Sequence, residues 1–461
     1  MARPIPDPRQ LTLILQVRGA LSGRALAEAM GVSEPTVTRL IKRLGSSIER
    51  VGAARSSRYL LRRVVRNFGD QWPVYRLDAD GRPRVWGQLR ALHGGFRFIP
   101  QGPAPAWMQA DYPDGLFSGL PFFLQEVRPQ GYLGRAIARD FAARQGAPTD
   151  LRQWNDDDVL SYFLTDGHDL PGDMIVGDRA MERAHRSAEN VSTTAVANDD
   201  RSRVYPEQAA AAQRGELIGS SAGGEQPKFL THVSRQPGQF QSVLVKFSSA
   251  DPSPVSQRWA DLLRCEHLAS ETMRARGIIA ARTEIIDAGG RRFLEVERFD
   301  RINACGRRGM ISLGALEDAF LAQPSADWSV AASLLEGEGW ISAAEARSLR
   351  WIWCFGDLIA NTDMHRANAS FWFGEKRPFT LTRFYDMLPM LYAPGSQGDL
   401  SERAFFPRPP LASVLDVWPD AATAAAGFWE RAGADAGLAP SFRAIAQANL
   451  LALRRLMERF V

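Results

Sequence analysis

The sequence predicts an α+β multidomain protein, in which an N-terminal winged helix-turn-helix precedes a β-rich N-terminal lobe and a helical C-terminal lobe. A chain of 461 residues is longer than one small core can organise. Alternating apolar and polar segments occur before about residue 300, and helical periodicity dominates after it. The first 70 residues hold 13 Lys and Arg against 5 Asp and Glu, a net charge of +8, although the whole chain carries +4. We expect domains over residues 1–70, 71–300 and 301–461.

Residues 21–45 have the pattern of a helix-turn-helix. Gly31 is suited to end a first short amphipathic helix, and Ser33 to cap a second one. Pro35 lies in the first turn of that second helix, where its missing N–H costs little. The apolar residues of the second helix recur on one face, which leaves a polar and basic face for the major groove of DNA. The outward residues are Thr36, Thr38, Arg39, Lys42 and Arg43.

Residues 48–63 resemble the wing of a winged helix. Two β-prone ends flank a Gly-Ala-Ala-Arg-Ser-Ser tip, from which Arg55 and Arg58 are expected to reach phosphates or the minor groove. Turn chemistry, periodicity and charge all agree with DNA binding. A purely structural three-helix unit, or a winged helix that binds a protein, remains the alternative.

The composition is that of a globular intracellular protein, with 45% hydrophobic and 23% charged residues. Cys265, Cys305 and Cys354 form no CxxC pair, which excludes a disulfide framework and a cysteine-based zinc site. No signal peptide and no apolar run of membrane-spanning length are visible. We therefore expect a cytoplasmic protein with no membrane partner.

The next part of the chain predicts a small β-rich subdomain followed by helices. Residues 74–98 alternate around a turn at Asp80-Gly81, and residues 128–170 have helical periodicity. The acidic run at 156–158 is expected at a helix N-terminus, in a structural role rather than as a metal site. Residues 186–213, which are polar and alanine-rich, are expected to be a loosely packed connection.

Residues 220–247 contain two features typical of a phosphate site. A glycine-rich stretch, SSAGGEQPK, precedes two β-prone segments joined by a Pro-Gly turn, although such a stretch alone is weak evidence. The strand 243–247 carries Lys246, which is costly to bury unless it meets an anion. Glu266, on a predicted helix over 259–274, is a candidate ion-pair partner for it.

The segment Asp363-Met364-His365-Arg366-Ala367-Asn368 and the later Asp386 have the layout of a protein-kinase catalytic loop and metal site. An apolar helix over 349–359 delivers Asp363 into a loop. Two strand-like runs, 370–373 and 379–384, are expected to form a hairpin that returns Asp386 to the side of Asn368.

Taken together, these motifs resemble the HipA-type serine/threonine kinase toxins. SxGGxxPK, the strand lysine, VERFDR, NTDxHxxN and the Tyr-Asp pair occur in the family's order over residues 72–461. The fused N-terminal unit makes the chain most similar to the YjjJ-like branch. The resemblance implies a HipA-like kinase fold that uses ATP and Mg²⁺.

The resemblance also implies a role for each matching residue. Asp363 is the expected catalytic base, Ser221 the autophosphorylation site, and Asn368 and Asp386 the Mg²⁺ ligands. The remaining matches are expected to bind ATP: Ala222, Gly223, Gly224, Glu225, Gln226, Pro227, Lys228, Lys246, Glu297, Arg298, Phe299, Asp300, His365, Arg366 and Tyr385.

Two positions depart from the family pattern. Met364 replaces the usual glycine after the catalytic Asp, and Ala367 replaces the lysine before the Asn. Arg366 is the nearest side chain that could supply the missing charge.

The expected function is ATP- and Mg²⁺-dependent phosphorylation of a protein on serine or threonine. By family analogy the substrate belongs to translation, and the fused unit gives DNA binding with autoregulatory or antitoxin-like control, as a homodimer on a symmetric operator. Two alternatives stay open: a DNA-binding regulator with a degenerate kinase body, and a small-molecule kinase. A nuclease is disfavoured, because no acidic cluster has the required HxD or ExK spacing.

Overall fold

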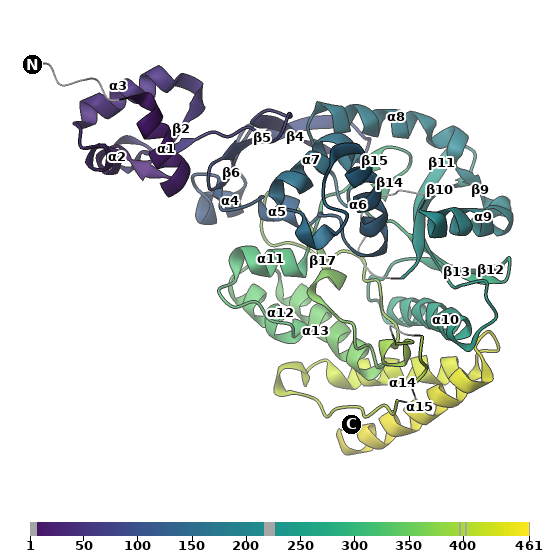
Figure 1. The fold of residues 1–461 in the computed structure, drawn as a ribbon. Coiled ribbons are helices and arrows are strands. Elements are labelled where there is room, and N and C mark those ends of the chain that lie inside the picture. The colour runs from purple at the N-terminus through teal and green to yellow at the C-terminus, as the bar shows by residue number, and fades with distance from the viewer. Residues whose placement is uncertain (1–6, 216–225, 396–397, 402, 461) are drawn as a thin grey trace, which may run out of the picture.

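The computed structural model describes residues 7–215, 226–395, 398–401 and 403–460, with the side chain of Arg55 also excepted. The N-terminal helices, in purple, project from one end of the molecule (Figure 1). The blue and teal parts of the chain carry most of the strands, and the green and yellow C-terminal helices pack together beside them. The largest buried core runs from Val65 to Leu456, so the middle of the chain and the C-terminal helices share one hydrophobic interior.

The N-terminal unit has its own smaller core, which includes Leu11, Leu26 and Leu40. Its three strands form an antiparallel sheet in the order β1-β3-β2. The elements of the unit are α1 (Pro8–Arg18), β1 (Leu21–Ser22), α2 (Gly23–Met30), α3 (Glu34–Leu44), β2 (Ile48–Val51) and β3 (Arg58–Leu61).

The turn between α2 and α3 follows from its residues. Ser22 Oγ accepts from Ala25 N at 3.1 Å and starts α2. Gly31 ends it in the left-handed region at φ 66°, where glycine lacks the steric penalty of other residues. Ser33 occupies the N-cap of α3, but its hydroxyl contacts Thr36 Oγ1 at 3.0 Å instead of capping the backbone. Both helices lie where the residue pattern predicts them.

The next sheet is antiparallel throughout, in the order β7-β6-β5-β4-β8. The predicted turn between β4 and β5 is confirmed: the Asp78 carboxylate accepts from the backbone N–H of Asp80 at 2.9 Å and of Arg82 at 2.8 Å. The strands are β4 (Gln71–Leu77), β5 (Pro83–Leu92), β6 (Gly95–Pro100), β7 (Leu116–Phe117) and β8 (Met174–Val176). The helices here are α4 (Ala106–Asp111), α5 (Phe122–Gln125), α6 (Gly131–Gln145), α7 (Asp156–Asp166) and α8 (Asp178–Thr194).

The acidic run 156–158 has the predicted structural role. It forms the first turn of α7, where Asn155 Oδ1 accepts from Asp158 N at 3.0 Å and Asp158 Oδ2 accepts from Asn155 N at 3.0 Å. Asp157 pairs with Arg63 at 2.6 Å. These carboxylates complete a helix N-terminus and anchor the strand that leaves the N-terminal unit.

The expectation of a loosely packed connection over 186–213 was wrong. These residues form the end of α8 and most of α9 (Arg201–Arg214). The polar residues cover one side of each helix, while Val191 on α8 and Tyr205 on α9 are buried. Alanine favours helix, so the composition that looked like a linker belongs to two amphipathic helices.

A second five-stranded sheet follows, in the order β12-β13-β11-β10-β9. The hairpin of β10 and β11 pairs Lys228 with Lys246, so both lysines lie at the same level of the sheet. α10 contacts β13, β12 and β11 and carries Glu266. The elements are β9 (Val196–Ala197), β10 (Lys228–Gln236), β11 (Gln239–Phe247), α10 (Pro254–Ala275), β12 (Thr283–Ala288) and β13 (Arg291–Glu297).

The rest of the chain is mainly helical. The predicted hairpin around residues 370–384 is only half formed, because only its first run is a strand, and that strand pairs with β16. The second run sends its backbone N–H groups to three different neighbours: Phe379 to Trp340, Thr382 to Ser370 and Phe384 to Ile279. The elements are β14 (Arg301–Ile302), β15 (Gly306–Arg307), β16 (Met310–Ser312), α11 (Leu313–Phe320), α12 (Trp328–Gly337), α13 (Ala343–Leu358), β17 (Ser370–Trp372), α14 (Trp418–Ala434) and α15 (Pro440–Phe460).

Within the described ranges, none of these helices combines the length and the apolar character needed to cross a lipid bilayer.

Candidate active site

A cavity of about 710 Å³ lies where the second sheet meets the helical part of the chain. It collects predicted site residues from five separate stretches of sequence. Those that line it are Gln226, Pro227, Lys228, Lys246, Glu297, Arg298, Phe299, Asp300, Asp363, His365, Asn368, Tyr385 and Asp386. Ser221, Ala222, Gly223, Gly224 and Glu225 lie outside the described residues.

Lys246 on β11 is one of the buried cations that line this cavity, with 4% of its surface exposed. Its Nζ donates to both carboxylate oxygens of Glu266, at 2.8 and 2.7 Å, and also to Asp386. Burial alone would lower the pKa of Lys246, but the Asp386 and Glu266 carboxylates raise it well above its ordinary value. The strand lysine therefore remains charged, and its pairing with Glu266 is confirmed.

Asp386 lies opposite Lys246 in a constrained backbone conformation. Its φ of 59° is in the left-handed region, which a residue other than glycine adopts at an energetic cost. Burial opposes its ionisation, but Lys246 and Lys228 lower the pKa of its carboxyl. The side chain is still 28% exposed, so the carboxylate faces both Lys246 and the cavity.

Asp363 is held by its backbone and leaves its carboxylate free. Asn361 Oδ1 accepts from Asp363 N at 3.1 Å, and Asn368 Nδ2 donates to Asp363 O at 2.9 Å. The Asp363 side chain is exposed on the cavity wall, and within the described part of the chain no donor contacts its carboxylate. A fixed backbone with an unengaged carboxylate suits a group that must receive a substrate hydroxyl.

Asn361 received no role from the sequence, in which it is only the first residue of the NTDxHxxN motif. Its Oδ1 holds Asp363, and its Nδ2 donates to Asp386 O at 3.2 Å. One buried amide thus ties together the two acidic segments of the site. A buried Asn immediately before the catalytic loop carries no periodicity that could have signalled this contact.

The two positions that depart from the family pattern leave the cavity walls intact. Met364 packs against the main core, and its sulfur lies where a side chain on Gly356 of α13 would be, 2.1 Å from the Cβ position. Ala367 lines the cavity, and its carbonyl accepts from Tyr385 Oη at 2.9 Å. Met364 therefore fastens the loop to α13, and Ala367 joins it to the segment of Asp386.

Arg366 does not join the other predicted residues. Its guanidinium donates to Asp318 Oδ1 at 2.6 Å and approaches Glu317 at 3.5 Å, both on α11. It lines a neighbouring cavity of about 810 Å³, not the one that contains Asp363. The expectation that Arg366 supplies the charge missing at Ala367 is thus not supported, because its charge is already compensated.

Arg298 and Asp300, predicted beside the adenine and ribose, belong to a buried ionic network. Arg298 contacts Asp169 at 3.1 Å and Asp300 at 2.9 Å, and Arg301 contacts Asp300 at 2.6 Å. Despite burial, Arg298 and Arg301 lower the pKa of Asp300 to about 2. These side chains fix the segment after β13, which leaves its backbone and Phe299 to face the cavity.

Glu126 is a further residue that the sequence did not reveal. It lines both cavities and accepts from Ser312 N at 3.2 Å and Ser312 Oγ at 2.8 Å. Burial raises the pKa of its carboxyl to about 7. A single Glu after the short helix α5 has no local signal, because its importance depends entirely on the fold.

The donor set of the cavity suits Mg²⁺ in part. Mg²⁺ prefers oxygen ligands and commonly takes one or two side chains, with waters and phosphate oxygens completing the shell. Asp386 offers a carboxylate, and Asn368, whose Nδ2 is engaged, has its Oδ1 left for a cation. Among the described residues no group of three or more His, Cys, Asp or Glu could hold a metal by itself. A cation at this site would therefore take its remaining ligands from water or from phosphate oxygens.

The candidate DNA-binding residues occupy the outer face of the N-terminal unit. Thr38, Arg39, Lys42 and Arg43 are exposed on α3, while Thr36 is partly buried. Arg58 on β3 pairs with Asp114 at 2.7 Å, so its charge is partly compensated. The side chain of Arg55 lies outside the described atoms.

Comparisons with known proteins agree with these observations. Residues 68–185 match the family model of the YjjJ-like toxin middle domain, and residues 220–448 match that of the HipA-like C-terminal domain. The chain is 36% identical over 449 residues to Toxin YjjJ of Escherichia coli (strain K12), covering 96% of this chain and 97% of that protein.

Two solved structures are similar to the chain at lower levels. One is the HipA toxin of Shewanella oneidensis MR-1 in complex with HipB and operator DNA, with 15% identity and a TM-score of 0.47, covering 84% of this chain and 97% of that chain. The other is the proinflammatory kinase CtkA of Helicobacter pylori, with 11% identity and a TM-score of 0.36, covering 52% of this chain and 91% of that chain.

Proposed function

The chain belongs to the YjjJ-like branch of the HipA-type toxins, and from that premise we propose that it transfers the γ-phosphoryl group of ATP to a serine or threonine hydroxyl of a protein. The observation that carries the proposal is the convergence of Lys246, Asp363, Asn368 and Asp386 on one cavity. They come from a strand, a catalytic loop and the segment after it, in the order that a kinase uses.

In this mechanism Asp363 aligns the acceptor hydroxyl and takes its proton. It needs little basicity, because the loose transition state of phosphoryl transfer depends mainly on alignment and charge stabilisation. Lys246 offsets negative charge on the phosphates, and Glu266 keeps the lysine in place. Asn368 and Asp386 would hold Mg²⁺, which when bound neutralises charge on the phosphate oxygens. Phe299, whose ring centroid is 5.8 Å from that of Tyr385, offers an apolar wall to the adenine.

Incubation of the purified chain with Mg²⁺ and γ-labelled ATP tests this proposal. We expect label on protein, including on Ser221, whose phosphorylation would add negative charge beside the predicted phosphate site. Mass spectrometry of the peptide covering residues 214–228 locates that label. If the chain neither labels protein nor releases heat on titration with MgATP, the alternative of a DNA-binding regulator with a degenerate kinase body is favoured. Label on a metabolite alone would indicate a small-molecule kinase.

We also propose that residues 1–70 form a winged helix-turn-helix that binds DNA through α3 and exerts antitoxin-like control from within the same chain. The support is an exposed basic face on α3 whose Lys42 and Arg43 have no acidic partner within ion-pair distance among the described residues. An inner face that includes Val37 and Leu40 secures this helix to the small core. Dimers usually read symmetric operators, so a homodimer on DNA is part of the proposal.

The double variant Lys42→Ala/Arg43→Ala tests the DNA contact. We expect weaker binding to a duplex taken from upstream of the chain's own gene, and a salt dependence shallower by about 2, since each lost phosphate contact removes roughly one unit of slope. Fluorescence anisotropy over a range of salt concentrations measures both. The control Arg18→Ala/Arg24→Ala removes two exposed arginines outside α3. Equal losses in the two double variants would contradict a specific role for α3.

A further inference from the structure

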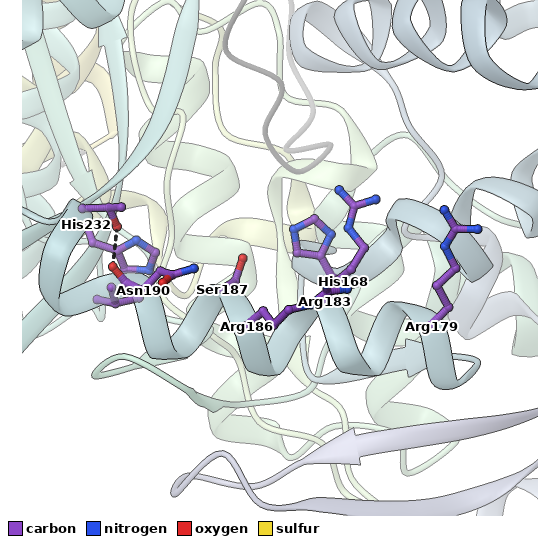
Figure 2. A pocket seen from close by; sticks show the side chains of 9 residues that line it. His168, Arg179, Arg183, Arg186, Ser187, Asn190 and His232 are labelled. Atoms are coloured by element: carbon purple, nitrogen blue, oxygen red, sulfur yellow. Dashed lines mark hydrogen bonds between the residues drawn. The ribbon is translucent and has the colours of Figure 1, made fainter.

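A second cavity, of about 640 Å³, lies along α8 and is unrelated to the site of Asp363. Figure 2 shows Arg179, Arg183 and Arg186 following one another along this helix, with Ser187 and Asn190 beyond them. His168, from the 3-10 turn Gly167–Asp169, forms part of the opposite wall. Only the part of this surface from Arg186 to Thr194 lies in the stretch that the sequence suggested to be a loose connection, and the fold brings the other lining residues beside it.

The spacing of these residues places them on one face of the helix. Arg179, Arg183, Arg186 and Asn190 follow at intervals of four, three and four residues, the repeat of one helical face. At 1.5 Å per residue the stripe is about 16 Å long. A duplex of nucleic acid presents about ten phosphate charges over that length. The stripe therefore matches an extended polyanion better than a single small anion.

The three arginines differ in whether their guanidinium groups pair with a carboxylate of the protein. Arg183 is fixed, because its guanidinium pairs with Asp166 and donates to Thr165 O at 3.1 Å. Arg179 and Arg186 are exposed, and among the described residues neither has a carboxylate within ion-pair distance. Glu182 precedes Arg186 by four residues, the spacing of a helical ion pair, yet the two side chains do not pair. Two cations thus remain available to a ligand on either side of an anchored one.

The other walls of the cavity do not offset this charge. Burial lowers the pKa of both His168 and His232, so both rings are neutral near pH 7. Within the described part of the chain, no carboxylate lines the cavity. The Ser187 hydroxyl and the Asn190 amide add hydrogen-bond donors, which commonly contact phosphates and sugars.

The lining also distinguishes between classes of ligand. Small-molecule sites are mostly apolar and enclosing, and protein-binding surfaces need buried aromatic or aliphatic anchors. Here Val191 is the single apolar side chain among the described lining residues. Surfaces for single-stranded nucleic acid commonly add Phe, Tyr or Trp rings on which bases stack, and no such residue lines this groove in the described part of the chain. The imidazole rings of His168 and His232 are partly buried. Charge and donors without Phe, Tyr or Trp rings fit contacts to the backbone of a duplex.

We propose that the α8 groove binds the phosphate backbone of a nucleic-acid duplex through Arg179 and Arg186, as a contact surface separate from the N-terminal unit. It reads no base sequence, because it offers only backbone contacts. Arg183 positions the stripe by its bond to Asp166 and is not counted among the ligand contacts. The proposal is independent of phosphoryl transfer and has a binding readout of its own.

The test is the full-length double variant Arg179→Ala/Arg186→Ala, titrated against a 30-base-pair DNA duplex and an RNA duplex of the same sequence. We expect weaker binding and a log K against log salt slope that is shallower by about 2, since roughly 0.9 unit is lost for each phosphate contact. The matched control Arg274→Ala/Arg455→Ala removes two exposed arginines from α10 and α15, and we expect it to keep the wild-type slope. Unchanged thermal melting of both variants confirms folding.

Each outcome decides the proposal. A loss confined to DNA, confined to RNA, or equal on both supports it and identifies the duplex. A wild-type slope in Arg179→Ala/Arg186→Ala overturns it, as does an equal loss in the control. Polyglutamate serves as a peptide polyanion: if the α8 variant loses affinity for polyglutamate but keeps its affinity for both duplexes, the groove binds an acidic protein segment and the proposal is wrong.

Discussion

Replacement of Asp363 by asparagine is expected to lower phosphoryl transfer by roughly 10²- to 10⁴-fold, the usual contribution of a positioned acid–base group. The loop should keep its shape, because the contacts that hold Asp363 involve its backbone N–H and carbonyl. The exposed carboxylate has no donor among the described residues, so its loss removes no folding contact. We therefore expect the activity to fall while the unfolding temperature stays within about 1 °C of the wild type.

Transfer of ³²P from γ-labelled ATP, together with thermal melting of the same samples, measures this effect. Asp199→Asn, which changes an exposed carboxylate on the 3-10 turn Asn198–Asp200, is the matched control and should keep full activity. Phosphoproteomics of cells that express the wild type or Asp363→Asn would then identify the substrate. Wild-type labelling by Asp363→Asn would exclude Asp363 as the catalytic base.

Much of the active site could be predicted, because short local sequence patterns identify its residues. Lys246 interrupts an apolar strand, and a lysine at such a position requires an anion; the structure supplies Glu266 and Asp386. Asp363 and Asn368 lie in one short loop, so their proximity follows from sequence separation alone. The return of Asp386 to the side of Asn368 was also predicted, but through a hairpin that is only half formed, because the run before Asp386 is held by single bridges to three separate segments.

What could not be predicted depends on contacts between distant segments. The sequence suggests that Arg366 belongs to the site, but its guanidinium pairs with Asp318 on α11, 48 positions earlier. The groove along α8 was hidden because alanine and polar residues from position 186 onward suggest a linker, and because no local pattern connects this helix with His168 and His232. Burial raises the pKa of Glu126 although its hydrogen bonds to Ser312 on β16 lower it, and no local pattern connects Glu126 with the distant segments around it.

Replacement of Lys246 by methionine is expected to damage both stability and activity. The variant removes the lysine that pairs with Glu266, 3% exposed, and with Asp386, and it leaves Lys228 as the remaining cation near the two carboxylates. Removal of one partner from a buried ion pair typically costs about 3–5 kcal/mol. Because Asp386 is partly exposed and can be solvated, we expect a loss near the lower end, about 3 kcal/mol, with ATP-dependent labelling abolished. Urea unfolding at pH 7.5 measures the loss of stability, and Lys376→Met, which changes an exposed lysine, is the control.

The pH dependence of that loss separates the ionic cause from simple repacking. In the wild type, the pKa of Asp386 is lowered by folding, so its charge stabilises the fold above the ordinary pKa of an aspartate, and this stability is lost as the pH falls. The pKa of Lys246 is raised by folding, so its contribution to stability is lost only at alkaline pH. In Lys246→Met, burial and the Asp386 carboxylate raise the pKa of Glu266, and Lys228 is the cation left to oppose them. A fall from pH 7.5 to 5.5 should therefore protonate Glu266 and recover part of the lost stability.

The double variant Lys246→Met/Glu266→Gln should recover stability at pH 7.5 but not labelling. An equal loss at both pH values, with no recovery in the double variant, would show that the cost comes from packing and not from unpaired charge.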